Sequence, residues 1–244
     1  MEKLSTKGKS DREVQDFIAQ FYGKRYSGSG FLYHSKIVTE MLDGVRMSDR
    51  RSDKILDSGC GIGFISQLYP NFDITGIDLS EEMLKRNPFK WRKMDAEQMD
   101  FPDNSFDFVV CRSLLHHLDS PSKGLAEMYR VLKPGGTWVC WDPNYSFFSE
   151  LFRAAARHTD RFSHVHKNFK AEEFKRLIEN AGFKIKEIKF IGFLAYPLCG
   201  FPDIKDFKIP LGLAKSLIAL DDFIGKTPLK RLAWSIMIKA TKEA

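Results

Sequence analysis

Three glycines at alternate positions in the stretch ILDSGCGIG, residues 55–63, are the first candidates for a ligand site. They are Gly59, Gly61 and Gly63, and a short apolar run precedes them. A dinucleotide-binding turn, GxGxxG, would place its third glycine where this chain has Phe64, and a Walker phosphate loop would end in Gly-Lys-Ser/Thr. The spacing therefore argues against NAD and ATP as ligands.

An acid two residues ahead of the first glycine, Asp57, favours a different ligand. Its carboxylate could face an ammonium group, directly or through water, while the bare backbone at Gly59 and Gly61 leaves room for an uncharged thio-ribose. Asp78 ends the next apolar run, close to the offset of about 20 residues at which an acid accepts hydrogen bonds from ribose hydroxyls. This combination suits a nucleoside that carries an amino acid and needs no phosphate.

A third acid, Asp95, follows the short run FKWRKM. Its carboxylate could accept a hydrogen bond from an adenine amino group, while the Ala96 N–H meets a ring nitrogen. Taken alone, Asp95 is more simply explained as a helix-capping or turn acid. After the two preceding motifs, the adenine-binding interpretation is the stronger one.

Two adjacent histidines, His116 and His117, are the candidate catalytic residues. An imidazole titrates near neutrality and could remove a proton from an acceptor, although both rings could instead have purely structural roles. Three further histidines are too sparse for a metal site, and no metal is expected: His158, His164 and His166.

The elements that position these residues form an alternating series from Lys54 onward. Short apolar runs alternate with helical patterns, which predicts an α/β protein with a parallel sheet and helices on both faces. Strands are predicted at 54–58, 73–78, 89–94, 106–111, 137–142, 184–191 and 233–241. Helices are predicted at 122–136 and at 171–183, the second stopped by Gly182. The glycine turn, Asp78 and Asp95 then all follow strand ends.

In this order the motifs resemble class I S-adenosylmethionine-dependent methyltransferases, in particular the group of ubiquinone and menaquinone biosynthesis enzymes, over about Lys54 to Asn144. The resemblance implies a Rossmann-like seven-stranded sheet in the order 3-2-1-4-5-7-6 with an antiparallel last strand. It also implies S-adenosyl-L-methionine as cofactor and S-adenosyl-L-homocysteine as product. Residue by residue, it implies that Asp57, Gly59, Cys60, Gly61 and Gly63 hold the methionine end, Asp78 and Leu79 the ribose, Asp95 and Ala96 the adenine, and that Arg112 and Ser113 line the methyl region.

We expect residues 1–244 to form a single methyltransferase domain. Helices within 11–45 would form a lid in which Tyr26 closes over the cofactor, and the insertions 145–169 and 192–231 would form a cap. Because the insertions are rich in apolar and aromatic residues, the expected acceptor is a small hydrophobic molecule, methylated at oxygen or carbon. The same side chains could instead pack the cap's own core or a homodimer interface.

The formal net charge of +6 would suit RNA or a membrane surface, but the basic residues are scattered. The Asn/Asp-Pro-Pro-Tyr motif of nucleic-acid N-methylating enzymes should follow the fourth strand, where this chain has CRSLL, so a nucleic-acid partner is disfavoured. An RNA-modifying enzyme and a catalytically silent binding subunit stay open as alternatives. Without a signal segment or a long apolar run, the protein is expected to be cytoplasmic with no stable membrane insertion.

Overall fold

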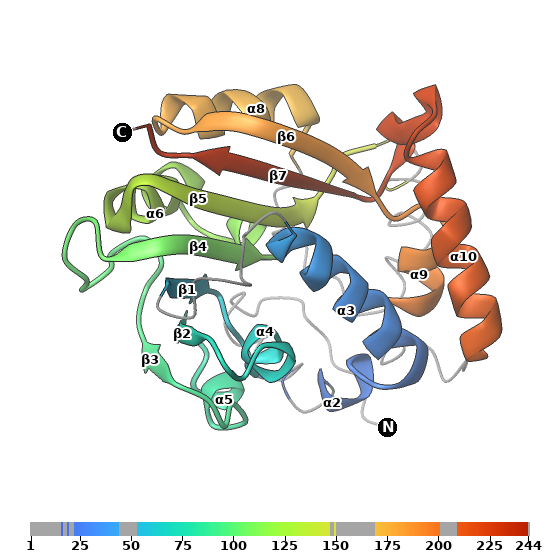
Figure 1. The fold of residues 1–244 in the computed structure, drawn as a ribbon, viewed down its shortest axis with the longest axis horizontal. Helices are drawn as coiled ribbons and strands as arrows, with labels where there is room; N and C mark the ends of the chain where they lie inside the picture. The colour runs from blue at the N-terminus through green and yellow to red at the C-terminus, as the bar shows by residue number, and fades with distance from the viewer. Residues whose placement is uncertain are drawn as a thin grey trace.

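The chain folds around one seven-stranded sheet in the order β3-β2-β1-β4-β5-β7-β6 (Figure 1). The computed structural model describes residues 16, 19, 22–43, 53–146, 149, 169–200 and 209–243. The strands are β1 (Lys54–Ser58), β2 (Asp73–Asp78), β3 (Trp91–Lys93), β4 (Phe106–Arg112), β5 (Leu132–Pro143), β6 (Lys184–Ile191) and β7 (Ser235–Thr241). Strand β7 runs antiparallel to both of its neighbours. The strand order and the reversed last strand that the resemblance implied are therefore confirmed.

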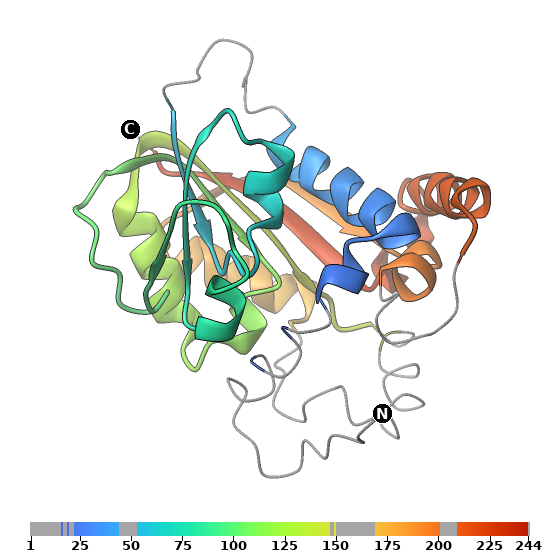
Figure 2. The same ribbon diagram turned by 90° about the horizontal axis from the view of Figure 1, so that it is seen from below.

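Helices cover both faces of the sheet (Figure 2). Helices α3, α9 and α10 lie over one face, while α6 and α8 lie over the other. The helices are α2 (Tyr22–Arg25), α3 (Gly28–Leu42), α4 (Phe64–Leu68), α5 (Glu81–Leu84), α6 (Pro121–Val131), α8 (Ala171–Asn180), α9 (Ala195–Cys199) and α10 (Leu211–Ile224). Two short 3-10 helices are η2 (Leu115–His117) and η3 (Pro228–Leu232). None of the helices in the described segments is long and apolar enough to cross a membrane.

Side-chain alternation along the central strands divides the core into two layers. Leu56, Val109 and Trp138 pack toward α6 and α8, whereas Ile55 and Val110 pack toward α3 and α10. All five side chains are fully buried. Strands that are buried on both faces have nearly continuous apolar sequences, which is why these strands could be predicted from the sequence.

One predicted boundary is wrong. The helix expected at 122–136 ends at Val131, and the following LKPGGTW belongs to β5. The cause is Pro134, which has no N–H for a helix and disfavours helical backbone at the residue before it. The pairing of β5 with β4 shifts register in this region, and Gly135 takes a left-handed φ of 75°. The predicted stop at Gly182, in contrast, is confirmed by α8 ending at Asn180.

The predicted lid and cap are described only in part. Helices α2 and α3 lie within 11–45, α9 and α10 lie within 192–231, and η3 extends one residue beyond that second range. Most of 145–169, including the three sparse histidines, lies outside the described residues.

Candidate active site

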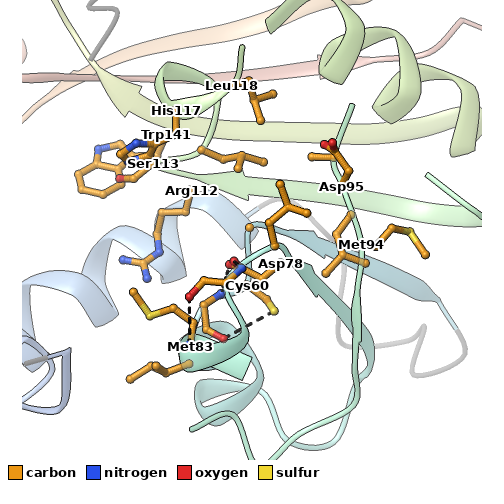
Figure 3. Close-up of a pocket in the computed structure, with 18 of the residues that line it drawn as sticks. Cys60, Asp78, Met83, Met94, Asp95, Arg112, Ser113, His117, Leu118 and Trp141 are labelled. Atoms are coloured by element: carbon orange, nitrogen blue, oxygen red, sulfur yellow. Dashed lines mark hydrogen bonds between the residues drawn. The ribbon is translucent and has the colours of Figure 1, made fainter. Parts of the chain in front are cut away.

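A cavity of about 420 Å³ lies at the carboxyl ends of β1, β2 and β4, where the strand order changes direction (Figure 3). This is the edge at which open α/β sheets bind ligands, and the volume suits a small molecule. Residues predicted from the sequence that line it are Tyr26, Gly59, Cys60, Gly61, Asp78, Leu79, Asp95, Ala96, Arg112, Ser113 and His117. Asp57, Gly63 and His116 are not on its wall.

The glycine turn is held by the end of the neighbouring strand. The N–H groups of Gly59 and Cys60 donate to the Ile77 carbonyl at 2.8 and 3.0 Å, and the Gly61 N–H donates to Asp78 Oδ2 at 2.8 Å. Gly59 and Gly61 have φ values of 76° and 51°, which residues with a Cβ rarely adopt. The turn therefore presents bare backbone to the cavity.

Gly63 has a different reason to be glycine. Its φ is 80°, and a Cβ at this position would lie 2.3 Å from Asn87 Oδ1. The residue packs against the segment after α5 and starts α4, away from the cavity wall. A left-handed backbone and a close neighbour are enough to require glycine here, and the methionine contact implied for Gly63 stays a prediction.

Asp57 is buried behind the turn, with only 2% of its surface exposed. Burial raises its pKa to about 7, and Asp78 contributes in the same direction while Arg112 opposes the shift. The ionised form of Asp57 is therefore destabilised in the ligand-free protein, and a nearby cation would stabilise it. Because Asp57 does not line the cavity, its influence on a ligand has to pass through the turn or through water.

The far end of the cavity is a slot whose wall mixes apolar and acidic side chains. Figure 3 shows Asp95 and Met94 at this end, Arg112 and Trp141 at the other, and Asp78 between them. One Asp95 oxygen accepts from the Glu97 N–H at 2.8 Å, so this acid also stabilises its own turn. Met94 and Leu118 line the slot beside it. A flat heterocycle that carries an amino group would match this arrangement.

Similarity to known proteins agrees with this geometry. Residues 56–140 match the family described as "Methyltransferase domain". Demethylmenaquinone methyltransferase from Listeria welshimeri is 32% identical over 171 residues, which cover 63% of this chain and 72% of that protein. The chain belongs to the class I S-adenosylmethionine-dependent methyltransferases.

Two further proteins are similar to this methyltransferase. A ubiquinone/menaquinone biosynthesis C-methyltransferase from Desulfotalea psychrophila is 38% identical over 108 residues, covering 40% of this chain and 44% of that one. A solved S-adenosylmethionine-dependent methyltransferase from Thermotoga maritima, described as a possible histamine N-methyltransferase, has the same fold, with a TM-score of 0.65 and 20% identity over 95% of this chain and 99% of that one.

The cofactor of the methyltransferase is S-adenosylmethionine, and the charges of the cavity fit it. Four acidic side chains line the wall: Asp78, Asp95, Glu97 and Asp119. Carboxylates would repel a phosphate but attract a sulfonium and an ammonium group. Among the described residues, no group of three or more His, Cys, Asp or Glu is placed to hold a metal ion.

The two predicted catalytic histidines of the methyltransferase have different surroundings. His116 is buried with its Nδ1 2.6 Å from Asp142 Oδ1, and its backbone N–H donates to the same oxygen. His117 lines the cavity, with its ring centroid 3.9 Å from that of His116. Burial raises the pKa of Asp78, and it raises the pKa of Asp142 to about 7. His117 lies close enough to both carboxyls to lower their pKa values in part. The contact with Asp142 favours a structural role for His116, and its catalytic role stays a prediction.

A histidine that the sequence analysis missed, His34 of α3, lies beside Arg112. Its Nε2 is 3.0 Å from the Gly200 carbonyl, and its Nδ1 is 3.4 Å from Arg112 Nη1. Since a carbonyl only accepts, Nε2 carries the proton and Nδ1 accepts from the guanidinium. Burial lowers the pKa of His34, and Arg112 lowers it further, which keeps the ring neutral.

Arg112 is oriented from a second side by the predicted lid residue. Its guanidinium donates to the Tyr26 hydroxyl, and the Tyr26 ring stacks on Phe64 with centroids 4.0 Å apart. Ser113, the next residue, has a left-handed φ of 53° and donates its N–H to the Trp141 carbonyl at 2.7 Å. Such a backbone conformation in a residue other than glycine is common at functional sites.

Proposed function

We propose that this methyltransferase methylates a carbon or oxygen atom of a small apolar aromatic acceptor, such as a quinone-type ring. The observation that carries the proposal is the aromatic end of the cavity, which is lined by Tyr26, Trp141 and Tyr196. The last of these belongs to the predicted cap, on α9, and its ring packs edge-on to Trp141 with centroids 5.5 Å apart. Aromatic faces pack well against a flat apolar ring. The names of the quinone-biosynthesis relatives support the same acceptor class.

The proposed cofactor contacts follow the positions of the residues around the cavity. We assign Gly59, Cys60 and Gly61 to the methionine end with Asp57 acting from behind the turn, Asp78 and Leu79 to the ribose, Asp95 and Ala96 to the adenine, and Arg112 and Ser113 to the carboxylate and methyl region.

Catalysis then depends mainly on positioning. Bound S-adenosylmethionine supplies an electrophilic methyl group on a good leaving group. The aromatic walls exclude water and hold the acceptor ring in line with the methyl group, which can supply much of the rate acceleration. His117 accepts the proton that a hydroxyl or an acidic ring carbon must lose as the new bond to the methyl group forms. Its place on the cavity wall, close to the carboxyls of Asp78 and Asp142, supports this role.

The test uses purified enzyme and cofactor labelled with tritium in the methyl group. Reduced demethylnaphthoquinones and fractionated cell extract are supplied as acceptors, and the label is followed into lipid-soluble small molecules, water-soluble metabolites and RNA. We expect the label in an aromatic product that organic solvent extracts, and NMR of that product distinguishes an O-methyl from a C-methyl group. Label confined to RNase-sensitive material would replace this proposal with the RNA-modifying alternative.

A further inference from the structure

An apolar strip lies on the outer face of α10 and η3, far from the core-facing side of the helix. Leu213, Leu220 and Phe223 of α10 are 50%, 43% and 67% exposed, and Leu229 of η3 is 56% exposed. The first three recur at helical spacing, and Ser216 and Ala219, also exposed, place no charge between them. Figure 1 shows α10 at one end of the molecule, beside α3 and α9.

The helix that carries this strip is firmly anchored. Its inner face buries Ala214, Ile218 and Asp221. The carboxylate of Asp221 accepts hydrogen bonds from three successive backbone N–H groups, those of Phe193, Leu194 and Ala195, at 2.8 to 3.0 Å. The exposed leucines and the phenylalanine therefore belong to a fixed surface.

The rim of the strip is basic. Four exposed cationic side chains flank it: Lys215, Lys226, Lys230 and Arg231. The two acids of α10 do not balance them, because Asp221 is buried in the helix-start contact and Asp222 pairs with Lys36 at 2.7 Å. An apolar strip with a cationic rim matches the surface of an anionic bilayer, where apolar side chains enter the acyl boundary and cations meet phosphates.

We propose that the α10–η3 strip docks the enzyme onto an anionic lipid surface. In a dimer formed through this strip, the second copy would cover the apolar residues. The same strip of that copy would offer no anionic partner for the lysines. Helix α10 packs on α9, which carries the cavity residue Tyr196. Docking would thus bring the aromatic end of the cavity close to apolar molecules dissolved in lipid; only this delivery of the acceptor rests on the proposed function.

The experiment is co-sedimentation of the purified full chain with vesicles of equal parts phosphatidylglycerol and phosphatidylcholine, compared with vesicles of phosphatidylcholine alone. We expect binding to the anionic vesicles that weakens with salt, and much weaker binding to the neutral ones. The double variant Leu220→Ser, Phe223→Ser should lose most of the binding. Lys226→Ser with Lys230→Ser should weaken it by about fivefold for each lysine removed.

The matched charge control is Lys85→Ser with Lys90→Ser, two exposed lysines near the other edge of the sheet, which should bind vesicles as wild type does. All variants should bind S-adenosylmethionine normally, which shows that they are folded and separates this test from the acceptor assay. Failure of the wild type to bind anionic vesicles at low salt would overturn the proposal. The proposal would also be overturned if the wild type self-associated without binding vesicles and the double variant Leu220→Ser, Phe223→Ser abolished that self-association.

Discussion

The Asp78 carboxylate accepts a hydrogen bond from the Gly61 N–H at 2.8 Å, so the end of β2 fixes the turn that follows β1. Its second oxygen accepts from the Ser80 N–H at 2.9 Å. Each carboxylate oxygen has a further lone pair, so the same group can serve the turn and a ligand hydroxyl together. One side chain therefore links the shape of the glycine turn to the proposed ribose contact.

Replacing Asp78 by Asn should weaken S-adenosylmethionine binding by at least about tenfold. The amide places an NH₂ group where an oxygen accepts from either Gly61 or Ser80, and the loss of one such charged hydrogen bond corresponds to about 1.5–3 kcal/mol. Isothermal titration calorimetry measures the change. Asp100→Asn, at an exposed residue paired with Arg92, is the matched control. Unchanged affinity in Asp78→Asn would contradict the ribose assignment.

The adjacent histidines should give opposite results when each is replaced by alanine. His117→Ala should reduce kcat by about 10²-fold or more while cofactor affinity and stability change little, as expected for loss of a general base. His116→Ala should instead lower the free energy of unfolding by about 3 kcal/mol, because it leaves the Asp142 carboxyl buried without its ring partner. Steady-state kinetics and urea unfolding separate the two effects. Wild-type kinetics for His117→Ala would leave it only a structural role.

Gly63→Ala should destabilise the fold more than Gly135→Ala does. Both glycines have left-handed φ values, 80° and 75°, so both substitutions carry a backbone cost of about 1–2 kcal/mol. A Cβ at Gly63 also meets Asn87 at 2.3 Å, whereas one at Gly135 has nothing within 4 Å, so steric strain should add about 1–3 kcal/mol only at Gly63. Urea unfolding of both variants measures this difference, and equal losses would refute the proposed close packing.

The buried carboxyl of Asp57 should make the ligand-free protein less stable as the pH rises from about 4 to 7. Its pKa is about 7 in the folded chain and near 3.9 when unfolded, so the folded state binds more protons in this range. The free energy of unfolding is highest below the pKa of the unfolded state and falls as the pH rises to the pKa of the folded state. The total loss is at most on the order of 4 kcal/mol. Asp57→Asn cannot ionise and should lack this part of the pH dependence.

The measurement is urea unfolding of wild type and Asp57→Asn at pH 5 and pH 8. The variant should gain stability relative to wild type between these two values. Asp100→Asn, at an exposed acid, should keep the wild-type pH dependence. Parallel pH profiles for wild type and Asp57→Asn would show that Asp57 is not the group responsible.

The sequence by itself determined the sheet, the cofactor and much of the cavity wall. Its strands are local apolar runs, and Gly59, Asp78 and Asp95 each follow a strand end, so their meeting is a consequence of parallel strands sharing one carboxyl edge. The motifs that contain these residues are short and local in sequence, so they can be recognised without a structure.

Only the tertiary structure decided which of two adjacent histidines faces the cavity. It turned His116 toward Asp142 and left His117 on the cavity wall, although the two are adjacent in sequence. It also brought His34 and Tyr196 to the cavity. These residues are 162 positions apart on two different helices, and nothing in the local sequence distinguishes them from core residues. Such contacts depend on how helices pack across the sheet, and packing is a property of the folded chain that no short stretch of residues encodes.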